Sequence, residues 1–207
     1  MIIGCGPGGA GYLTLQACRA VESAEVVAGP AKLLRLFPQA ANRLQLPSAR
    51  AEEIAGLLAK QTADRIAVLV SGDTGFYSLA ATLRQVLPAH WVLQFMPGIS
   101  SVQAACALFN LSWQDMRFYS LHSRPLTPEL IAAAGQGAEP LAILCGPDHP
   151  PGRIARELLA VVEPGRACHV ACDIGSENQK IWSGIVCELA QEKMSSHAVC
   201  IIDRRRP

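Results

Sequence analysis

The sequence predicts an α/β protein made of two α/β domains with mostly parallel sheets and a cleft between them. Three observations support this prediction: short β-rich runs alternate with helical patterns, glycine-rich turns follow the β-rich runs, and a second alternating series starts near residue 117. Strand–helix alternation is typical of parallel sheets covered by helices. We therefore expect one domain over residues 1–112 and a second over residues 113–207, with the segment NLSWQD as the connector.

The expected elements follow from the periodicity of apolar residues along the chain. The expected strands are residues 1–4, 25–28, 65–70, 91–96, 117–120, 141–145, 166–173 and 198–203. The expected helices are residues 10–21, 49–61, 77–87, 101–108, 128–134 and 153–161. Residues 180–182 are a candidate for one further strand, and the segment that follows them is ambiguous.

Composition excludes several classes of partner. The chain has 207 residues, of which 50% are apolar and 17% are charged, and its net charge is +1. A nearly neutral chain argues against nucleic acid as a partner. No apolar run approaches the roughly 20 residues of a membrane span, and no basic segment followed by an apolar stretch opens the chain. We therefore expect a cytoplasmic protein with no membrane partner.

The eight cysteines predict a reducing compartment rather than a metal site. None of them forms a C-x-x-C pair, and several lie in apolar runs such as LAILCG and HAVCII, which is typical of reduced core cysteines. The nearest approach to a metal motif is Cys168-His169-x-x-Cys172, which lies in a predicted strand. His169 would then face away from the two cysteines, so we expect no metal.

Five turns rich in Gly, Pro, Ser or Asp follow predicted strands. They read GCGPGGAG, SGDTGFY, PGISSV, CGPDHPP and DIGSENQ. Loops after the strands of an open α/β sheet form its ligand crevice. Glycine lets a backbone approach a ligand closely, and helix N-termini offer free N–H groups to anions. A single turn of this kind is common between a strand and a helix in α/β proteins, but five of them favour a cleft that surrounds a small molecule.

The first of these loops raises the hypothesis that the chain is a dinucleotide-dependent oxidoreductase. GCGPGG fits the G-x-G-x-x-G spacing, but such a fold also has an acidic residue at the end of the second strand. Here that position reads Ala28-Gly29-Pro30, and Pro7 removes an N–H group from the loop itself. The spacing matches and the context does not. An oxidoreductase and a binding module without turnover remain as alternatives.

Three longer segments together resemble the tetrapyrrole methylase family. They read GCGPGGAGYLTLQACRAVESAEVVAG, VLVSGDTGFYSLAATL and MPGISSVQAACA, and the resemblance covers nearly the whole chain. It implies an S-adenosylmethionine-dependent enzyme of two α/β domains and, as is usual in the family, a homodimer. The chain departs from the family pattern in SGDT, where SGDP is usual, and in GPGG, where GPGD is usual.

Within the family, SLHSRP and LCGPDHPPGRIAREL are most similar to the branch that methylates carbon-5 of a precorrin or cobalt-precorrin in cobalamin biosynthesis. The chain length leaves no room for the decarboxylating domain fused to longer relatives, so a separate decarboxylating methyltransferase is a candidate partner. A family member with different regiochemistry or a different substrate is the main alternative.

The resemblance also implies a set of residues that bind S-adenosylmethionine. They are Pro7, Ser71, Gly72, Asp73, Phe76, Ser100, Ser101, Cys145 and Gly175. Asp73 would pair with the ammonium group of the cofactor, although an aspartate that caps a turn or a helix is the alternative interpretation. Cys145 would lie near the adenine, and Gly175 would close that side.

The implied substrate is a tetrapyrrole, a precorrin fringed with acetate and propionate groups. Arginine suits planar carboxylates, and Arg124 in LHSRP is the expected partner for one of them. The reaction would displace the sulfonium methyl group by a ring carbon. His122 is the candidate base for a proton that the macrocycle loses, because an ordinary histidine pKa suits exchange near neutral pH.

Overall fold

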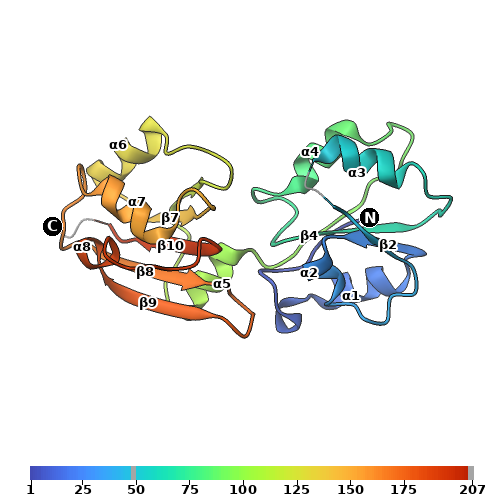
Figure 1. Ribbon diagram of the computed structural model, residues 1–207, viewed down its shortest axis with the longest axis horizontal. Helices are drawn as coiled ribbons and strands as arrows, with labels where there is room; N and C mark the ends of the chain where they lie inside the picture. The colour runs from blue at the N-terminus through green and yellow to red at the C-terminus, as the bar shows by residue number, and fades with distance from the viewer. Residues whose placement is uncertain (48–49, 205–207) are drawn as a thin grey trace. The chain divides into compact units, whose positions relative to one another are not determined.

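A computed structural model describes residues 1–47 and 50–204 of the chain. Contacts within the chain divide it into two compact units, Met1–Ser100 and Ser101–Pro207. Each unit contains one five-stranded sheet with helices packed on it (Figure 1). The α/β class predicted from the sequence is therefore confirmed. The helix at residues 101–108 belongs to the second unit by these contacts, and the domain boundary at residue 112 stays a prediction.

The sheet of the first unit is parallel throughout, in the order β3-β2-β4-β1-β5. Its strands are β1 (Ile2–Gly4), β2 (Val26–Gly29), β3 (Arg43–Gln45), β4 (Ile66–Val70) and β5 (Phe95–Met96). Every residue of β4 is buried. The unbroken apolar sequence IAVLV is what a parallel strand covered on both faces requires.

Helices cover both faces of this first sheet (Figure 1). They are α1 (Leu15–Glu22), α2 (Ala31–Leu34), α3 (Ala51–Leu58) and α4 (Leu79–Val86). Alternate strand residues point to opposite faces. Ile3 joins the core formed with α1 and α2, and its neighbour Ile2 joins the core formed with α3 and α4. The helix pairs α1/α2 and α3/α4 therefore lie on opposite sides of the sheet.

The sheet of the second unit has the order β6-β7-β10-β8-β9. Its strands are β6 (Arg117–Ser120), β7 (Leu141–Leu144), β8 (Ala167–Cys172), β9 (Lys180–Ile185) and β10 (Ala198–Ile202). Of these five strands, only β6 and β7 pair in parallel, so this sheet is mixed and differs from the expected mostly parallel pairing. The physical reason is that residues 173–179 form a turn too short for a crossover helix, which forces β9 to run antiparallel to β8.

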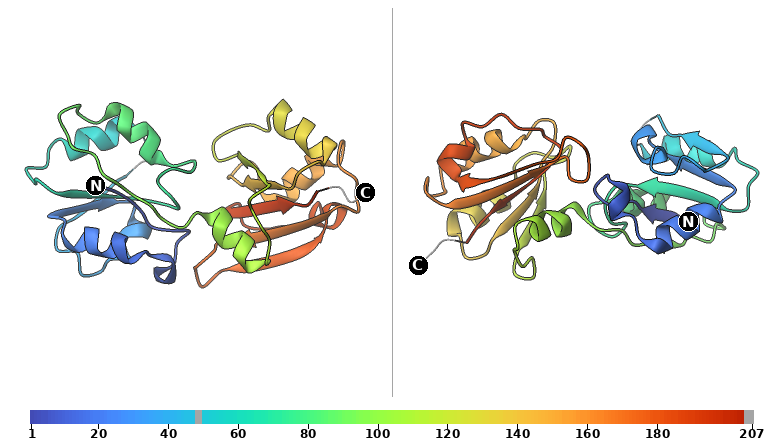
Figure 2. Two further views of the ribbon diagram at one scale, coloured as in Figure 1. Left: turned by 180° about the vertical axis from the view of Figure 1, so that it is seen from behind. Right: turned by 90° about the horizontal axis from the view of Figure 1, so that it is seen from below.

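The second sheet also has helices on both faces, as the two views of Figure 2 show. They are α5 (Ser101–Leu108), α6 (Pro128–Gln136), α7 (Pro151–Leu158) and α8 (Val186–Leu189). The apolar residues of α6, α7 and α8 share one core with β7, β8 and β10, whereas α5 packs on the opposite face. The hydroxyl of Thr127 caps α6, and Gly137 ends it in the left-handed conformation.

Several elements differ from the sequence prediction in length. The predicted helix over 10–21 is a short 3-10 turn followed by α1, because Thr14 has extended backbone and accepts a hydrogen bond from the N–H of Ala17. The predicted strand over 91–96 is reduced to β5 at the sheet edge. The helix predicted over 49–61 corresponds to α3, and its first residue lies outside the described part of the chain.

The cysteines lead to a testable prediction about thiol reactivity. Cys18 and Cys187 are partly exposed, and the other six, which are Cys5, Cys106, Cys145, Cys168, Cys172 and Cys200, are buried. Burial raises the pKa of the Cys5 and Cys168 thiols to about 12. Because the thiolate is the reactive species, we expect Ellman's reagent at pH 8 to label two thiols in the native protein and all eight after unfolding in denaturant.

A Cys18→Ala variant should lower the native count to one. Rapid labelling of the buried set without denaturant would contradict this packing.

The raised pKa of the Cys5 and Cys168 thiols also has a consequence for stability. Their folded-state pKa lies above the ordinary thiol value of 9.0, so the neutral thiols stabilise the fold below pH 9, and that stabilisation is lost as the pH rises toward 12.

Neither a membrane-spanning helix nor a cluster of metal-ligating side chains is found among the described residues, 1–47 and 50–204. No helix there is both long and apolar enough to cross a membrane, and no group of three or more His, Cys, Asp or Glu side chains is placed to hold a metal ion. In β8, Cys168 and Cys172 lie in the core, while the ring of His169 faces Phe109, 5.0 Å away between centroids. The strand alternation expected from the sequence thus separates the histidine from the cysteines.

Candidate functional site in the loops after the strands

The loops of the first unit leave the sheet at its topological switch point. β4, β1 and β5 are neighbours, so the loops after them emerge side by side at one edge. The loop after β1 leads to α1, and the loop after β4 leads to α4 on the opposite face. Where neighbouring connections diverge in this way, an open α/β sheet forms its ligand crevice. GCGPGG, SGDTGFY and PGISS all border this position.

Backbone hydrogen bonds join the first two of these loops. The N–H of Gly6 donates to the carbonyl of Gly72 over 3.2 Å, and the N–H of Gly72 donates to the carbonyl of Gly6 over 2.8 Å. Both residues have left-handed backbone, with φ of 72° at Gly6 and 67° at Gly72. Only glycine adopts this conformation routinely. The glycines at these two positions are therefore required by the loop pairing itself.

The third loop packs against the first two through glycine backbone. A Cβ atom on Gly98 would lie 2.3 Å from the carbonyl oxygen of Gly72 and 2.7 Å from the carbonyl carbon of Gly4. A Cβ atom on Gly4 would in turn lie 2.7 Å from that same Gly72 oxygen. Nothing larger than hydrogen fits at Gly4 or Gly98. Sequence reasoning missed both residues, although each lies at the junction of a strand and a glycine-rich turn.

Asp73 ties the second loop to the third. Its Oδ1 accepts a hydrogen bond from the N–H of Gly75 over 2.8 Å, and its Oδ2 accepts one from the N–H of Gly98 over 3.0 Å. The first bond is a turn-forming contact of the kind that aspartate favours. The second crosses between loops. A carboxylate offers about four lone-pair sites, so Asp73 keeps acceptor capacity for a cation while it holds both loops.

The remaining candidates of the first unit lie along the same loops. Pro7 is buried between Gly6 and Gly8, and Ser100 is 7% exposed. Ser71 is exposed, and the partly buried ring of Phe76 lies edge-on to Tyr77 with 4.9 Å between centroids. A Cβ atom on Gly72 would meet no described atom within 4 Å, so this backbone borders open space. The three glycine-rich loops, which are joined by hydrogen bonds and close backbone contacts, form what we call the glycine cradle. Such an arrangement next to open space fits a ligand that is held by main-chain groups.

In the second unit, the carboxyl ends of β6, β7 and β8 lie at one edge. β6 runs parallel to β7, and β10 runs antiparallel to both β7 and β8, so all three strands point the same way. The loop after β7 packs on the loop after β6: a Cβ atom on Gly146 would lie 2.5 Å from the carbonyl oxygen of Leu121 and 3.0 Å from the Cα of His122. His122 and Arg124 are both exposed on the loop after β6.

The three other candidates of this unit differ in their surroundings. Cys145 is 5% exposed, and its N–H donates to the carbonyl of Ala198 over 2.9 Å. Its side chain belongs to the core, so any contact with a ligand would have to come from its carbonyl group. Gly175 has φ of 78°, and its N–H donates to Oε1 of Gln179 over 2.7 Å within the turn after β8. Ser101 is the first residue of α5.

The chain matches the family model described as Tetrapyrrole (Corrin/Porphyrin) Methylases over residues 1–190. It belongs to the tetrapyrrole methylase family. The resemblance inferred from the glycine-rich motifs is thereby confirmed, and with it the prediction that the chain is a methyltransferase. β2 ends at Gly29 with no acidic residue there, in agreement with the argument against a dinucleotide-binding loop.

The sequence similarity of this methylase to its relatives extends over almost its full length. It is 30% identical to a cobalt-precorrin-7 C(5)-methyltransferase of Salmonella typhimurium, with 99% of this chain and 98% of the relative covered. It is 27% identical to a probable cobalt-precorrin-7 C(5)-methyltransferase of Methanocaldococcus jannaschii, with 98% and 96% covered.

Solved structures of methylases share its fold. Precorrin-6Y methylase of Archaeoglobus fulgidus superposes with a TM-score of 0.75 at 22% identity, covering 99% of this chain and 97% of the other. Uroporphyrin-III C-methyltransferase of Thermus thermophilus, solved in complex with S-adenosylhomocysteine, gives a TM-score of 0.74 at 19% identity, with 98% and 95% covered.

Proposed function

We propose that this methylase transfers a methyl group from S-adenosylmethionine to carbon-5 of a cobalt-precorrin in cobalamin biosynthesis. The observation that carries the proposal is the full-length similarity to two enzymes named for that reaction. The motifs LHSRP and CGPDHPP favour the same branch of the family. A methylase of the same family that acts on another ring carbon or another substrate is the alternative.

We assign cofactor binding to the residues predicted from the sequence. In the first unit these are Pro7, Ser71, Gly72, Asp73, Phe76 and Ser100, and in the second Ser101, Cys145 and Gly175. The assignment is supported by the glycine cradle and by the open space beside Gly72. When bound, S-adenosylmethionine would supply an electrophilic methyl group on its sulfonium. The chain needs no nucleophile of its own, and alignment alone can lower such a barrier by roughly 7–11 kcal/mol.

On the substrate side, we assign Arg124 to a carboxylate of the tetrapyrrole and His122 to the proton that the macrocycle loses. Both side chains are exposed on the loop after β6, where a large anionic ligand can reach them. Arginine can bind a carboxylate with two parallel hydrogen bonds. A homodimer, a separate decarboxylating methyltransferase as partner and a cytoplasmic location remain predictions.

Calorimetric titration tests the cofactor part of this proposal. The purified protein should bind S-adenosylhomocysteine with a Kd in the micromolar range, which corresponds to a binding free energy on the order of −8 kcal/mol. Titration with NAD or NADPH should give no heat of binding. Binding of a nicotinamide cofactor without any response to S-adenosylhomocysteine would overturn the proposal and identify GCGPGG as a dinucleotide-binding loop.

An Arg124→Gln variant tests the substrate part. We expect KM for the tetrapyrrole to rise about tenfold, because a bidentate charged contact is worth roughly 1.5–3 kcal/mol, while the Kd for S-adenosylhomocysteine stays unchanged. Arg117→Gln is the control, since Arg117 is exposed on β6 and pairs with Glu139. Equal KM values for the two variants would remove Arg124 from the substrate site.

A further inference from the structure

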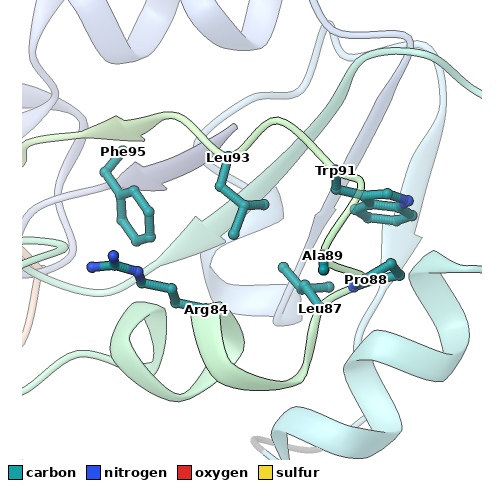
Figure 3. A pocket seen from close by; sticks show the side chains of 7 residues that line it. All are labelled: Arg84, Leu87, Pro88, Ala89, Trp91, Leu93 and Phe95. Atoms are coloured by element: carbon teal, nitrogen blue, oxygen red, sulfur yellow. The ribbon is translucent and has the colours of Figure 1, made fainter.

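A pocket of about 480 Å3 opens on the first unit, away from the glycine loops. It lies between the last turn of α4 and the segment that leads into β5 (Figure 3). Its walls are formed by Arg84, Leu87, Pro88, Ala89, Trp91, Leu93 and Phe95. These residues precede or begin β5, whereas the glycine loops follow the strands. The pocket therefore belongs to the opposite edge of the sheet, and the assigned cofactor residues take no part in it.

Arg84 is the one charged residue among the seven that form the wall of this pocket. Its side chain extends from α4 toward Phe95 (Figure 3). Within the part of the chain that the structure describes, it makes no ion pair and no side-chain hydrogen bond. Its guanidinium donors, which match planar anions, are therefore available beside six wall residues that carry no acidic group.

The rest of the wall is apolar and partly aromatic. Phe95 is 39% exposed, and Trp91 and Leu93 are only half-buried. Figure 3 shows Leu93 between the end of the pocket that holds Arg84 and Phe95 and the end that holds Trp91. Aromatic and branched side chains of this kind bind flat apolar surfaces. The volume falls within the range of small-molecule sites, roughly 300–1,000 Å3.

We propose that this pocket binds a small amphipathic anion, with an aromatic or flat apolar body against Trp91, Leu93 and Phe95 and one carboxylate or sulfonate on Arg84. The charge of Arg84 selects the anionic end, and the apolar wall selects the body. The site is separate from the proposed cofactor site, and its occupation does not depend on the methyl-transfer reaction.

Fluorescence titration with a pair of probes tests this site. 1-Anilinonaphthalene-8-sulfonate is the anionic probe, and N-phenyl-1-naphthylamine, which lacks the sulfonate, is its neutral counterpart. We expect the anionic probe to bind at least tenfold more tightly to the native protein. Arg84→Gln should remove that preference and leave the neutral probe's affinity unchanged, and saturating S-adenosylhomocysteine should displace neither probe.

Arg19→Gln is the matched control. Arg19 also lies in the last turn of its helix, is exposed and forms no ion pair with any described residue, so this variant changes the net charge equally. It should keep the preference for the anionic probe. Equal affinity of the two probes for the native protein, an unchanged preference in Arg84→Gln, an equal loss in both variants, or displacement by S-adenosylhomocysteine would each overturn the proposal.

Discussion

Replacing Asp73 by alanine should weaken S-adenosylhomocysteine binding about tenfold to a hundredfold. The change removes the bonds from the N–H groups of Gly75 and Gly98 to the carboxylate, and a hydrogen bond to a charged group is worth roughly 1.5–3 kcal/mol. Without it, the second and third loops of the first unit lose their side-chain link. Calorimetric titration measures the affinity, and amide hydrogen exchange at Gly98 reports the release of the loop.

Asp73→Asn separates the two roles of this residue. The asparagine amide has no negative charge. Its oxygen can still accept the hydrogen bond from the N–H of Gly75, but its NH2 group would then face the N–H of Gly98 and cannot accept from it. We expect an intermediate loss of affinity and faster exchange at Gly98. An Asp73→Ala variant that binds S-adenosylhomocysteine like the native protein would contradict both the loop link and the contact with the cofactor. If the variants lost affinity while exchange at Gly98 stayed slow, the role of Asp73 as a link between the loops would be wrong, and only its direct contact with the cofactor would explain the loss.

Replacing Gly98 by alanine should have the second large effect. The new methyl group would lie 2.3 Å from the carbonyl oxygen of Gly72 and 2.7 Å from Gly4, all of it backbone that cannot rotate away. The three loops would have to separate, and overpacking of this kind costs typically about 1–3 kcal/mol. We expect the midpoint of urea unfolding to fall and binding of S-adenosylhomocysteine to be lost or severely weakened.

Gly56→Ala is the matched control for Gly98→Ala. Gly56 lies within α3 and is exposed, and a methyl group added there would meet no described atom within 4 Å outside its own helix turn. Alanine in a helix interior is more stable than glycine by roughly 1 kcal/mol, so this variant should gain stability and keep its affinity. If Gly98→Ala behaved in the same way, the close approach of the three glycine loops would be wrong.

Strand and helix positions were predictable where one pattern dominated. The strand at β4 and the helix at α5 follow from an unbroken apolar run and from clear helical spacing. β3 was not predictable, because its sequence RLQ carries only one apolar residue and depends on pairing with β2 for its conformation. The antiparallel β9 extends beyond residue 182 because β8 supplies its hydrogen bonds.

The candidate site was predictable as a set of loops but not as a set of contacts. Glycine-rich turns after strands pointed to the right segments. The link from Asp73 to Gly98 joins residues far apart in sequence, and only the order β4-β1-β5 brings their loops together. The core position of the Cys145 side chain likewise depends on packing against strands that the local sequence does not specify.

Transfer of a labelled methyl group is the most direct test of the proposed reaction. The protein would be incubated with cobalt-precorrin-7 and S-adenosylmethionine carrying a 13C-methyl group, and the product followed by carbon NMR. We expect one new labelled methyl group, bonded to carbon-5 of the macrocycle, and stoichiometric S-adenosylhomocysteine. A labelled methyl group on another ring carbon, or no transfer by a protein that binds S-adenosylhomocysteine, would contradict the proposed reaction.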